Sequence, residues 1–273
     1  MREIRPRTPV QWLLVLAALL YAGVLLLAPI FAIVQKALAN GLQPVIDSLS
    51  EANVLHALQV TFWMTIAAVI INTIMGVVIA WVLTRQQFRG KRFLNLLVDI
   101  PFVFSPVIAG YTLIVLFGRT GWFAPTAFPI VFSLPGVLIA STFVSLPFVA
   151  REVGPVLGSL DREPEEAAYT IGASRWLTFR RVVLPGIWPG ILYGVVLTLA
   201  RALGEFGAVA VVGGGIEGQT ETATMFVFRA LNDRNEVGAY SMSLLLGLVA
   251  ILVLILMRLV RHNTVTTEVV NNE

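Results

Sequence analysis

Three ionisable residues lie within long apolar stretches, where an unpaired charge is costly and an ionisable group is often functional. Arg201 and Glu205 share one stretch, and Asp99 lies in another. Because Arg201 and Glu205 are four residues apart, a helix would place them on one face, where each lowers the desolvation cost of the other. The pair is either a neutralised contact that supports structure or a gate, or Arg201 lies near the path of an anion. Asp99 is a third pathway or gate candidate, although its position before Pro101 also fits the membrane interface.

The residue types needed for most enzyme chemistry are scarce in this chain. It has no cysteine, and its two histidines, His56 and His262, fall at opposite faces of the topology derived below. Neither Lys36 nor Lys91 completes a phosphate-binding loop, and no G-x-S-x-G or H-E-x-x-H motif is present. The sequence therefore predicts no catalytic residue, no metal site and no cofactor bound by this chain itself.

Composition places these residues in a membrane protein. Of the 273 residues, 57% are hydrophobic and only 13% are charged, against about 25% charged in soluble domains. A membrane-spanning helix needs about 20 mostly apolar residues, and six blocks qualify. The sequence therefore predicts an all-α, polytopic membrane protein with six transmembrane helices, at Trp12 to Val34, His56 to Leu83, Phe93 to Phe117, Ser133 to Ala150, Ile187 to Val212 and Val237 to Met257.

The cations predict the orientation of these helices. With the N-terminus in the cytoplasm, segments 1–11, 84–92, 151–186 and 258–273 lie inside and hold 14 of the 19 Lys and Arg residues. This asymmetry follows the positive-inside rule and places both termini in the cytoplasm. The first block could instead be a cleaved signal peptide. Its 23 uncharged residues exceed the usual h-region of about 7–15, so we expect it to be retained.

The inside segment 151–186 contains two short predicted helices separated by a glycine. Asp161 and Pro164 suit a helix start, and acidic residues follow in the first turn. Gly172 can end this helix, and Ser174 can cap a second one that leads toward Pro185. A compact helix of this kind, at about 161–173, can dock in a groove of a partner and pass a rigid-body motion to the neighbouring spans.

This segment resembles a known motif. Glu166, Ala167 and Ala168 are followed after three residues by Gly172 and after nine more by the run 182–185, a spacing similar to the EAA motif of permease subunits of ABC importers. The usual Ile is Val at the start of that run. The resemblance implies a type I importer permease fold and a coupling helix, formed by these four residues, that sits in a cleft of a cytosolic ATPase subunit.

Further stretches resemble a narrower group, the sulfate and thiosulfate permeases, and within it the W-type chain of the permease pair. They are residues 99–102, 105–107, 147–152, 193–198, 200–209 and 218–222. The resemblance implies a multi-pass protein of the bacterial cytoplasmic (inner) membrane. Its partners would be a homologous T-type permease, two ATPase subunits that bind ATP and Mg, an external solute-binding protein and membrane lipid, with no nucleic acid. Molybdate permeases share part of these stretches, so molybdate or tungstate stays an alternative substrate.

Other function classes explain the sequence less well. A secondary transporter or channel driven by an ion gradient would need paired intramembrane acids, repeated halves or a polar pore stripe, and only Asp99, Arg201 and Glu205 are present. We expect three parts: residues 1–55 with the tail, first helix and external loop; residues 56–261 as the permease domain; and a polar tail at 262–273.

Overall fold

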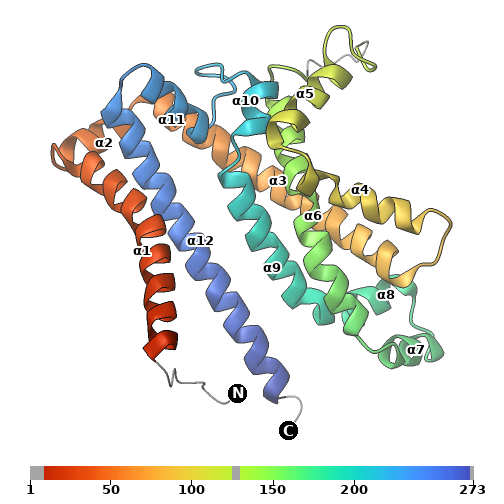
Figure 1. The fold of residues 1–273 in the computed structure, drawn as a ribbon. Helices are drawn as coiled ribbons and strands as arrows, with labels where there is room; N and C mark the ends of the chain where they lie inside the picture. The colour runs from red at the N-terminus through yellow and green to blue at the C-terminus, as the bar shows by residue number, and fades with distance from the viewer. Residues whose placement is uncertain (1–8, 125–129, 271–273) are drawn as a thin grey trace. The chain divides into compact units, whose positions relative to one another are not determined.

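Every regular element is a helix among the residues that the computed structural model describes, which are 9–124 and 130–270, with side chains as far as Arg258. This confirms the all-α prediction (Figure 1). The predicted tail with Arg2, Arg5 and Arg7 lies outside those residues. The helices are α1 (Pro9–Leu38), α2 (Gln43–Leu49), α3 (Ala52–Arg85), α4 (Lys91–Val103), α5 (Pro106–Phe117), α6 (Leu134–Ser159), α7 (Glu163–Thr170), α8 (Arg175–Thr178), the π-helix η1 (Phe179–Val183), α9 (Leu184–Leu203), α10 (Gly207–Gly213), α11 (Ala223–Asn232) and α12 (Glu236–Val270).

The chain divides into two compact units, which are described separately. The first comprises Met1–Glu51 with Val227–Leu248, and the second comprises Ala52–Phe226 with Val249–Glu273. In the first unit, the most apolar part of α1 buries none of its residues. A helix that is apolar all round suits a lipid environment. The second unit holds all the candidate residues.

Three helices of the second unit, α3, α6 and α9, pack closely because glycines line their contacts. A Cβ atom at Gly76 of α3 would lie 2.6 Å from Val149 Cβ of α6, and one at Gly194 of α9 would lie 2.8 Å from Val149 Cα. Small residues let helix backbones approach in membrane proteins. Val149, Val153 and neighbouring apolar residues are fully buried at this junction. The three helices therefore form one tightly packed core (Figure 1).

The third predicted span is broken. α4 and α5 meet at an angle of 115° instead of continuing as one helix. Phe104 and Ser105 between them have extended backbone, with ψ of 132° and 138°. Ser105 precedes Pro106, and the proline ring disfavours a helical conformation in the residue before it. Within the described residues, five helices are long and apolar enough to cross a membrane, or six if the bent pair counts as one span.

Two other helices end at different residues from the predicted spans. α6 continues to Ser159, so Arg151 lies within a helix that extends beyond the predicted span. The fifth predicted span ends at Leu203, and a separate helix, α10, begins at Gly207. Glu205 therefore lies in a break between helices, where it meets backbone N–H groups that a continuous helix would not offer.

Candidate functional site

The predicted coupling segment forms the short helix α7. Its eight residues run from Glu163 to Thr170, and none of them is buried. Pro164 lies in the first turn as expected, and the Asp161 carboxylate accepts a hydrogen bond from the Glu163 backbone N–H at 3.2 Å. The helix begins one residue later than predicted, because Arg162 and not Asp161 occupies the position before its first residue. Glu166 and Ala167 are exposed, and Ala168 is half-buried.

Gly172 ends α7 in the way the sequence predicts. Its φ is +85°, in the left-handed region that glycine adopts at little cost. The Gly172 N–H donates to the Tyr169 carbonyl and the Ala173 N–H donates to the Ala168 carbonyl, each at 3.0 Å. These two bonds are the Schellman arrangement, which satisfies carbonyls at a helix end. Nothing lies within 4 Å of the position a Cβ would take, so backbone conformation alone favours glycine here.

The segment after Gly172 continues directly into a spanning helix. Ser174 caps α8 as predicted, since its Oγ accepts from the Leu177 N–H at 3.3 Å. α8, η1 and α9 then run without a gap from Arg175 to Leu203. The Phe179 ring meets the Trp81 ring of α3 edge to face, with centroids 5.6 Å apart. The segment after Gly172 and the spanning part of α9 therefore form one continuous helical run.

Large apolar side chains surround the end of α7 without cover from this chain. Ile171 is 86% exposed, Trp176 is 69% exposed and Tyr169 is 44% exposed. Tyr169 and Ile171 belong to the segment that connects two spans, whereas Trp176 lies in the first turn of the helical run Arg175–Leu203. Exposed large apolar side chains in such a connecting segment are typical of an interaction surface.

One ion pair joins α7 to the end of α3, and the sequence reasoning missed it. Arg85 Nη2 lies 2.7 Å from Glu165 Oε1, and the two side chains are only 9% and 12% exposed. The same Nη2 lies 3.4 Å from the Leu160 carbonyl at the end of α6. The residues are 80 positions apart in the sequence, so only the fold could reveal the contact.

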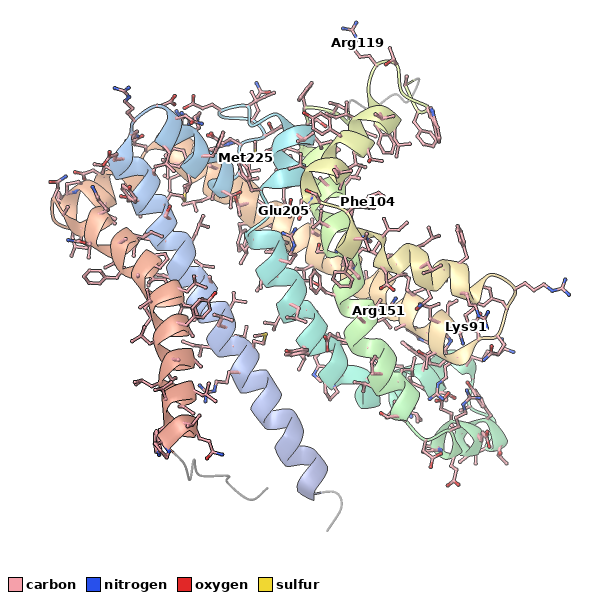
Figure 2. All side chains as sticks on the ribbon, viewed as in Figure 1. Lys91, Phe104, Arg119, Arg151, Glu205 and Met225 are labelled. Carbon is pink, nitrogen blue, oxygen red and sulfur yellow. The ribbon has the colours of Figure 1, made fainter. Side chains whose placement is uncertain are left out.

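Arg201 and Glu205 form the ion pair that their spacing predicts. Arg201 Nη1 lies 2.5 Å from Glu205 Oε2, and the two side chains are 30% and 2% exposed. The prediction that they share one helix is wrong, because α9 ends at Leu203. Glu205 Oε1 instead accepts a hydrogen bond from the Ala208 N–H at 2.9 Å and so caps α10. Figure 2 shows Glu205 between the end of α9 and α10. The carboxylate thus holds α9 and α10 together at the helix break.

Polar side chains from several helices surround this break. The Thr224 hydroxyl donates to the Glu205 carbonyl at 2.8 Å, and Thr61 Oγ1 of α3 accepts from the Ala223 N–H at 2.8 Å. A small cavity of about 10 Å³ lies here, with Glu205, Thr65 and Ser141 among its lining residues. That volume admits about one water molecule. The arrangement is a buried polar junction with room for water but not for an oxyanion.

Asp99 is paired as well, with a partner on another helix. Its Oδ1 accepts from Arg151 Nε of α6 at 2.8 Å. Arg151 also donates from Nη1 to Asn95 Oδ1 at 2.9 Å and from Nη2 to the Asn95 carbonyl at 3.1 Å. Arg151 thus ties α4 to the packed core next to the break between α4 and α5 (Figure 2).

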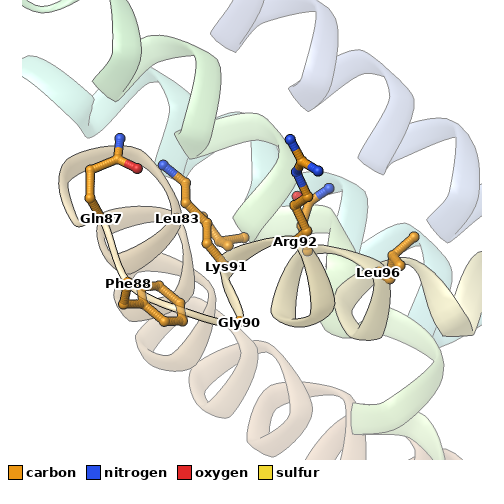
Figure 3. Close-up of a pocket in the computed structure, with 8 residues that line it drawn as sticks. Leu83, Gln87, Phe88, Gly90, Lys91, Arg92 and Leu96 are labelled. Atoms are coloured by element: carbon orange, nitrogen blue, oxygen red, sulfur yellow. The ribbon is translucent and has the colours of Figure 1, made fainter.

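A larger, open cavity of about 780 Å³ lies at the connection between α3 and α4. Its lining includes Lys91, Arg92 and Gln87, whose polar ends point to the same side of the loop in Figure 3. Lys91 is at the end of α4 distant from Glu205 (Figure 2), so this cavity is separate from the Arg201 junction. Among the side chains that the structure describes, in residues 9–124 and 130–258, no group of three or more His, Asp or Glu could hold a metal ion.

Residues 72–264 match the family model described as the inner membrane component of binding-protein-dependent transport systems. The chain belongs to this family. As a member, it is a multi-pass inner membrane permease component and not a catalytic subunit. The match covers every candidate residue named above.

Among the curated relatives of this permease component are several proteins named for sulfate transport. It is 44% identical to the "Sulfate transport system permease protein CysW" of Synechocystis sp., over 95% of this chain and 96% of the relative. It is 41% identical to the CysW protein of Escherichia coli, over 93% of this chain and 89% of that one. The CysT protein of Synechocystis sp. is 35% identical over 89% of this chain and 87% of the relative.

Solved structures share the fold of the permease component at low sequence identity. A chain of a bacterial alginate ABC transporter in complex with a periplasmic protein superposes with a TM-score of 0.75 at 16% identity, and the match covers 93% of each chain. A chain of the methionine ABC transporter MetNI superposes with a TM-score of 0.58 at 20% identity, over 81% of this chain and 98% of that chain. These likenesses confirm the ABC importer permease fold.

Proposed function

We propose that this chain is the permease subunit of an ATP-driven importer of sulfate, with thiosulfate as a related substrate. The substrate assignment rests on relatives named for sulfate transport at 41–44% identity over about nine-tenths of the chain. The alternative oxyanions, molybdate and tungstate, have no such support among those relatives. The W-type resemblance in residues 193–209 and 218–222 points the same way.

The observation that carries the coupling part of the proposal is α7 with its apolar surroundings. Glu166, Ala167 and Ala168 lie on a helix that buries none of its residues, next to an Ile171 side chain that is 86% exposed. A cytosolic ATPase subunit would cover this surface. Gly172 serves as the stop that keeps the helix short enough to fit a cleft in that subunit.

Transport then follows from the difference between two conformations. ATP binding closes the ATPase dimer and displaces α7, and the continuous run from α8 to α9 passes that displacement to the core of α3, α6 and α9. The bundle tips from inward-facing to outward-facing, and hydrolysis with product release resets it. This requires only that the two permease conformations bind the ATPase states with different affinity. ATP and Mg are bound by the partner, and this chain supplies half of the pathway.

In this proposal, the Arg201–Glu205 and Asp99–Arg151 ion pairs stabilise the helices that form the pathway. Arg201 keeps 30% of its side chain exposed while Glu205 is buried, so the cation is the member that can meet a passing anion. Glu205 orients Arg201 and caps α10. Asp99 acts through Arg151 by holding α4 next to the break, which places it in a gate-supporting role.

The assembly and topology complete the proposal. A T-type permease supplies the second half of the pathway, two ATPase subunits supply the energy, and an external solute-binding protein delivers the anion. Both termini lie in the cytoplasm, because segments 84–92 and 151–186 carry most of the cations between spans. Residues 56–261 form the permease domain, preceded by the first helix and external loop and followed by a polar tail.

Uptake by reconstituted vesicles tests this function. The chain, its T-type and ATPase partners and the solute-binding protein are co-reconstituted, and labelled sulfate uptake is measured with ATP, without ATP and with equimolar molybdate. We expect uptake that requires ATP and resists molybdate. Uptake abolished by molybdate would move the substrate to the alternative oxyanions, and uptake without ATP would refute the coupling role.

A further inference from the structure

We infer that Arg85 and Glu165 form a positioning pair that clamps the coupling helix α7 to the packed core, so that a displacement of α7 moves α3 as well as α9. This inference rests on the proposed function, because it assigns the pair a role in ATP-driven transport. Neither residue belongs to the motif that identified the coupling helix. Their juxtaposition at 2.7 Å comes from the fold alone.

The pair is built as a clamp between three elements. Arg85 is the last residue of α3, and its Nη2 reaches both Glu165 Oε1 in the first turn of α7 and the Leu160 carbonyl at the end of α6. The cation lies at a helix C-terminus and the anion at a helix N-terminus, so both helix dipoles favour the arrangement. One guanidinium therefore holds α3, α6 and α7 in a common geometry.

Burial makes this contact stronger than an ordinary surface ion pair. Exposed pairs contribute little, because water and salt screen them. Here the side chains are 9% and 12% exposed, and removing one partner would leave the other charge buried and uncompensated. By contrast, Arg89 in the loop after α3 is exposed. It provides a matched control that removes the same positive charge nearby.

Without the clamp, α7 would be joined to the core mainly through its own chain neighbours. It buries no residue, and the elements on which it packs, α8 and η1, follow it directly in the chain. The α3 helix, in contrast, packs along α6, where Gly154 and Gly158 face Thr84 at the same end as Arg85. Arg85 thus gives the coupling helix α7 a second attachment to the core. This attachment is to α3, which is not next to α7 in the sequence.

The first test measures how many sulfate ions the reconstituted complex imports for each ATP hydrolysed. R85A and E165Q should each lower this ratio about ten-fold or more, with ATPase activity retained, because the force then reaches α7 without being passed to α3. R85K should restore part of the ratio, since Lys keeps the charge but offers a point donor instead of the fork of Arg. The R85A/E165Q double variant should be no worse than either single variant, because both remove one interaction. R89A should match the wild type.

The second test is independent of transport. Hydrogen exchange of the α7 amides in the assembled complex should be about ten-fold faster or more in R85A and E165Q than in the wild type, and unchanged in R89A. Exchange that stays at the wild-type rate, or a ratio that stays at the wild-type value, would overturn the clamp. If the wild-type complex imported no sulfate, the proposed function would fail, and hydrogen exchange would still decide whether Arg85 holds α7.

Discussion

Replacing Gly172 by valine is the sharpest test of the coupling segment, because the structure leaves backbone conformation as the one physical cause of a loss of uptake. The φ of +85° is unfavourable for a β-branched residue, whereas nothing lies within 4 Å of the added Cβ. Holding a side chain in the left-handed region costs about 1–2 kcal/mol. The alternative, leaving the left-handed region, would break the two hydrogen bonds that end α7, each contributing about 1 kcal/mol. The chain adopts whichever alternative costs less, so the substitution destabilises the helix end at Gly172 by about 1–2 kcal/mol.

The substitution should change coupling without changing insertion. An altered helix end shifts α7 against its partner cleft. We therefore expect uptake of labelled sulfate to fall about ten-fold, since 1.4 kcal/mol corresponds to a factor of ten. Gly172→Asn should retain most activity, because Asn tolerates the left-handed region. Gly41 has a φ of +88° and equally open surroundings in the turn after α1, so Gly41→Val is a matched control for strain alone.

Membrane abundance and uptake are measured for all three variants in the same vesicles. Normal abundance with lost uptake in Gly172→Val, and near-normal uptake in Gly41→Val, is the expected result. Unchanged uptake in Gly172→Val would refute the reasoning that α7 must stop at this residue. Equal losses in both valine variants would assign the effect to general strain instead of coupling.

Three further predictions concern the paired charges and the helix core. Arg201→Ala should impair uptake more than Arg201→Lys, because Ala leaves the buried Glu205 carboxylate without its cation. Equal uptake by the two variants would favour a packing role for Arg201. Asp99→Asn and Arg151→Ala should each reduce uptake, because the two residues form one ion pair. The Asp99→Asn/Arg151→Ala double variant should lose no more uptake than Arg151→Ala alone, and additive losses would contradict a shared contact. Gly76→Val should lower the melting temperature in detergent, because the added side chain would overpack the contact between α3 and α6, at a cost of about 1–3 kcal/mol. An unchanged Tm would show that α3 and α6 can separate freely.

The sequence predicted the helical class, the apolar blocks and the coupling segment because each depends on local signals. Long uncharged runs identify spans, and the sequence from Pro164 to Ser174 contains the helix start, the glycine stop and the next cap in order. The left-handed Gly172 and the Ser174 cap follow from the conformational freedom of glycine and the chemistry of serine. These features need no tertiary contact to be recognised.

The sequence could not predict how distant charges meet or where apolar blocks break. Arg151 was placed at the start of an inside segment, and only the fold shows that Asp99 and Asn95 pair with its guanidinium. Glu205 was placed inside a helix, but the break before α10 lets it cap that helix. The third span was predicted as one apolar block, and the 115° bend between α4 and α5 depends on packing that local propensity does not specify.

The central claim is that α7 receives the movement of the ATPase, and cysteine cross-linking tests it most directly. The chain contains no cysteine, so Ala167→Cys introduces a single thiol on the exposed face of α7. A short thiol-to-amine reagent is applied to the assembled complex, with Ala39→Cys, exposed after α1, as the control. We predict a cross-link to the ATPase subunit from Ala167→Cys alone, with a yield that changes when ATP is added. No cross-link from Ala167→Cys in an intact complex, or equal yields from both positions, would contradict the account.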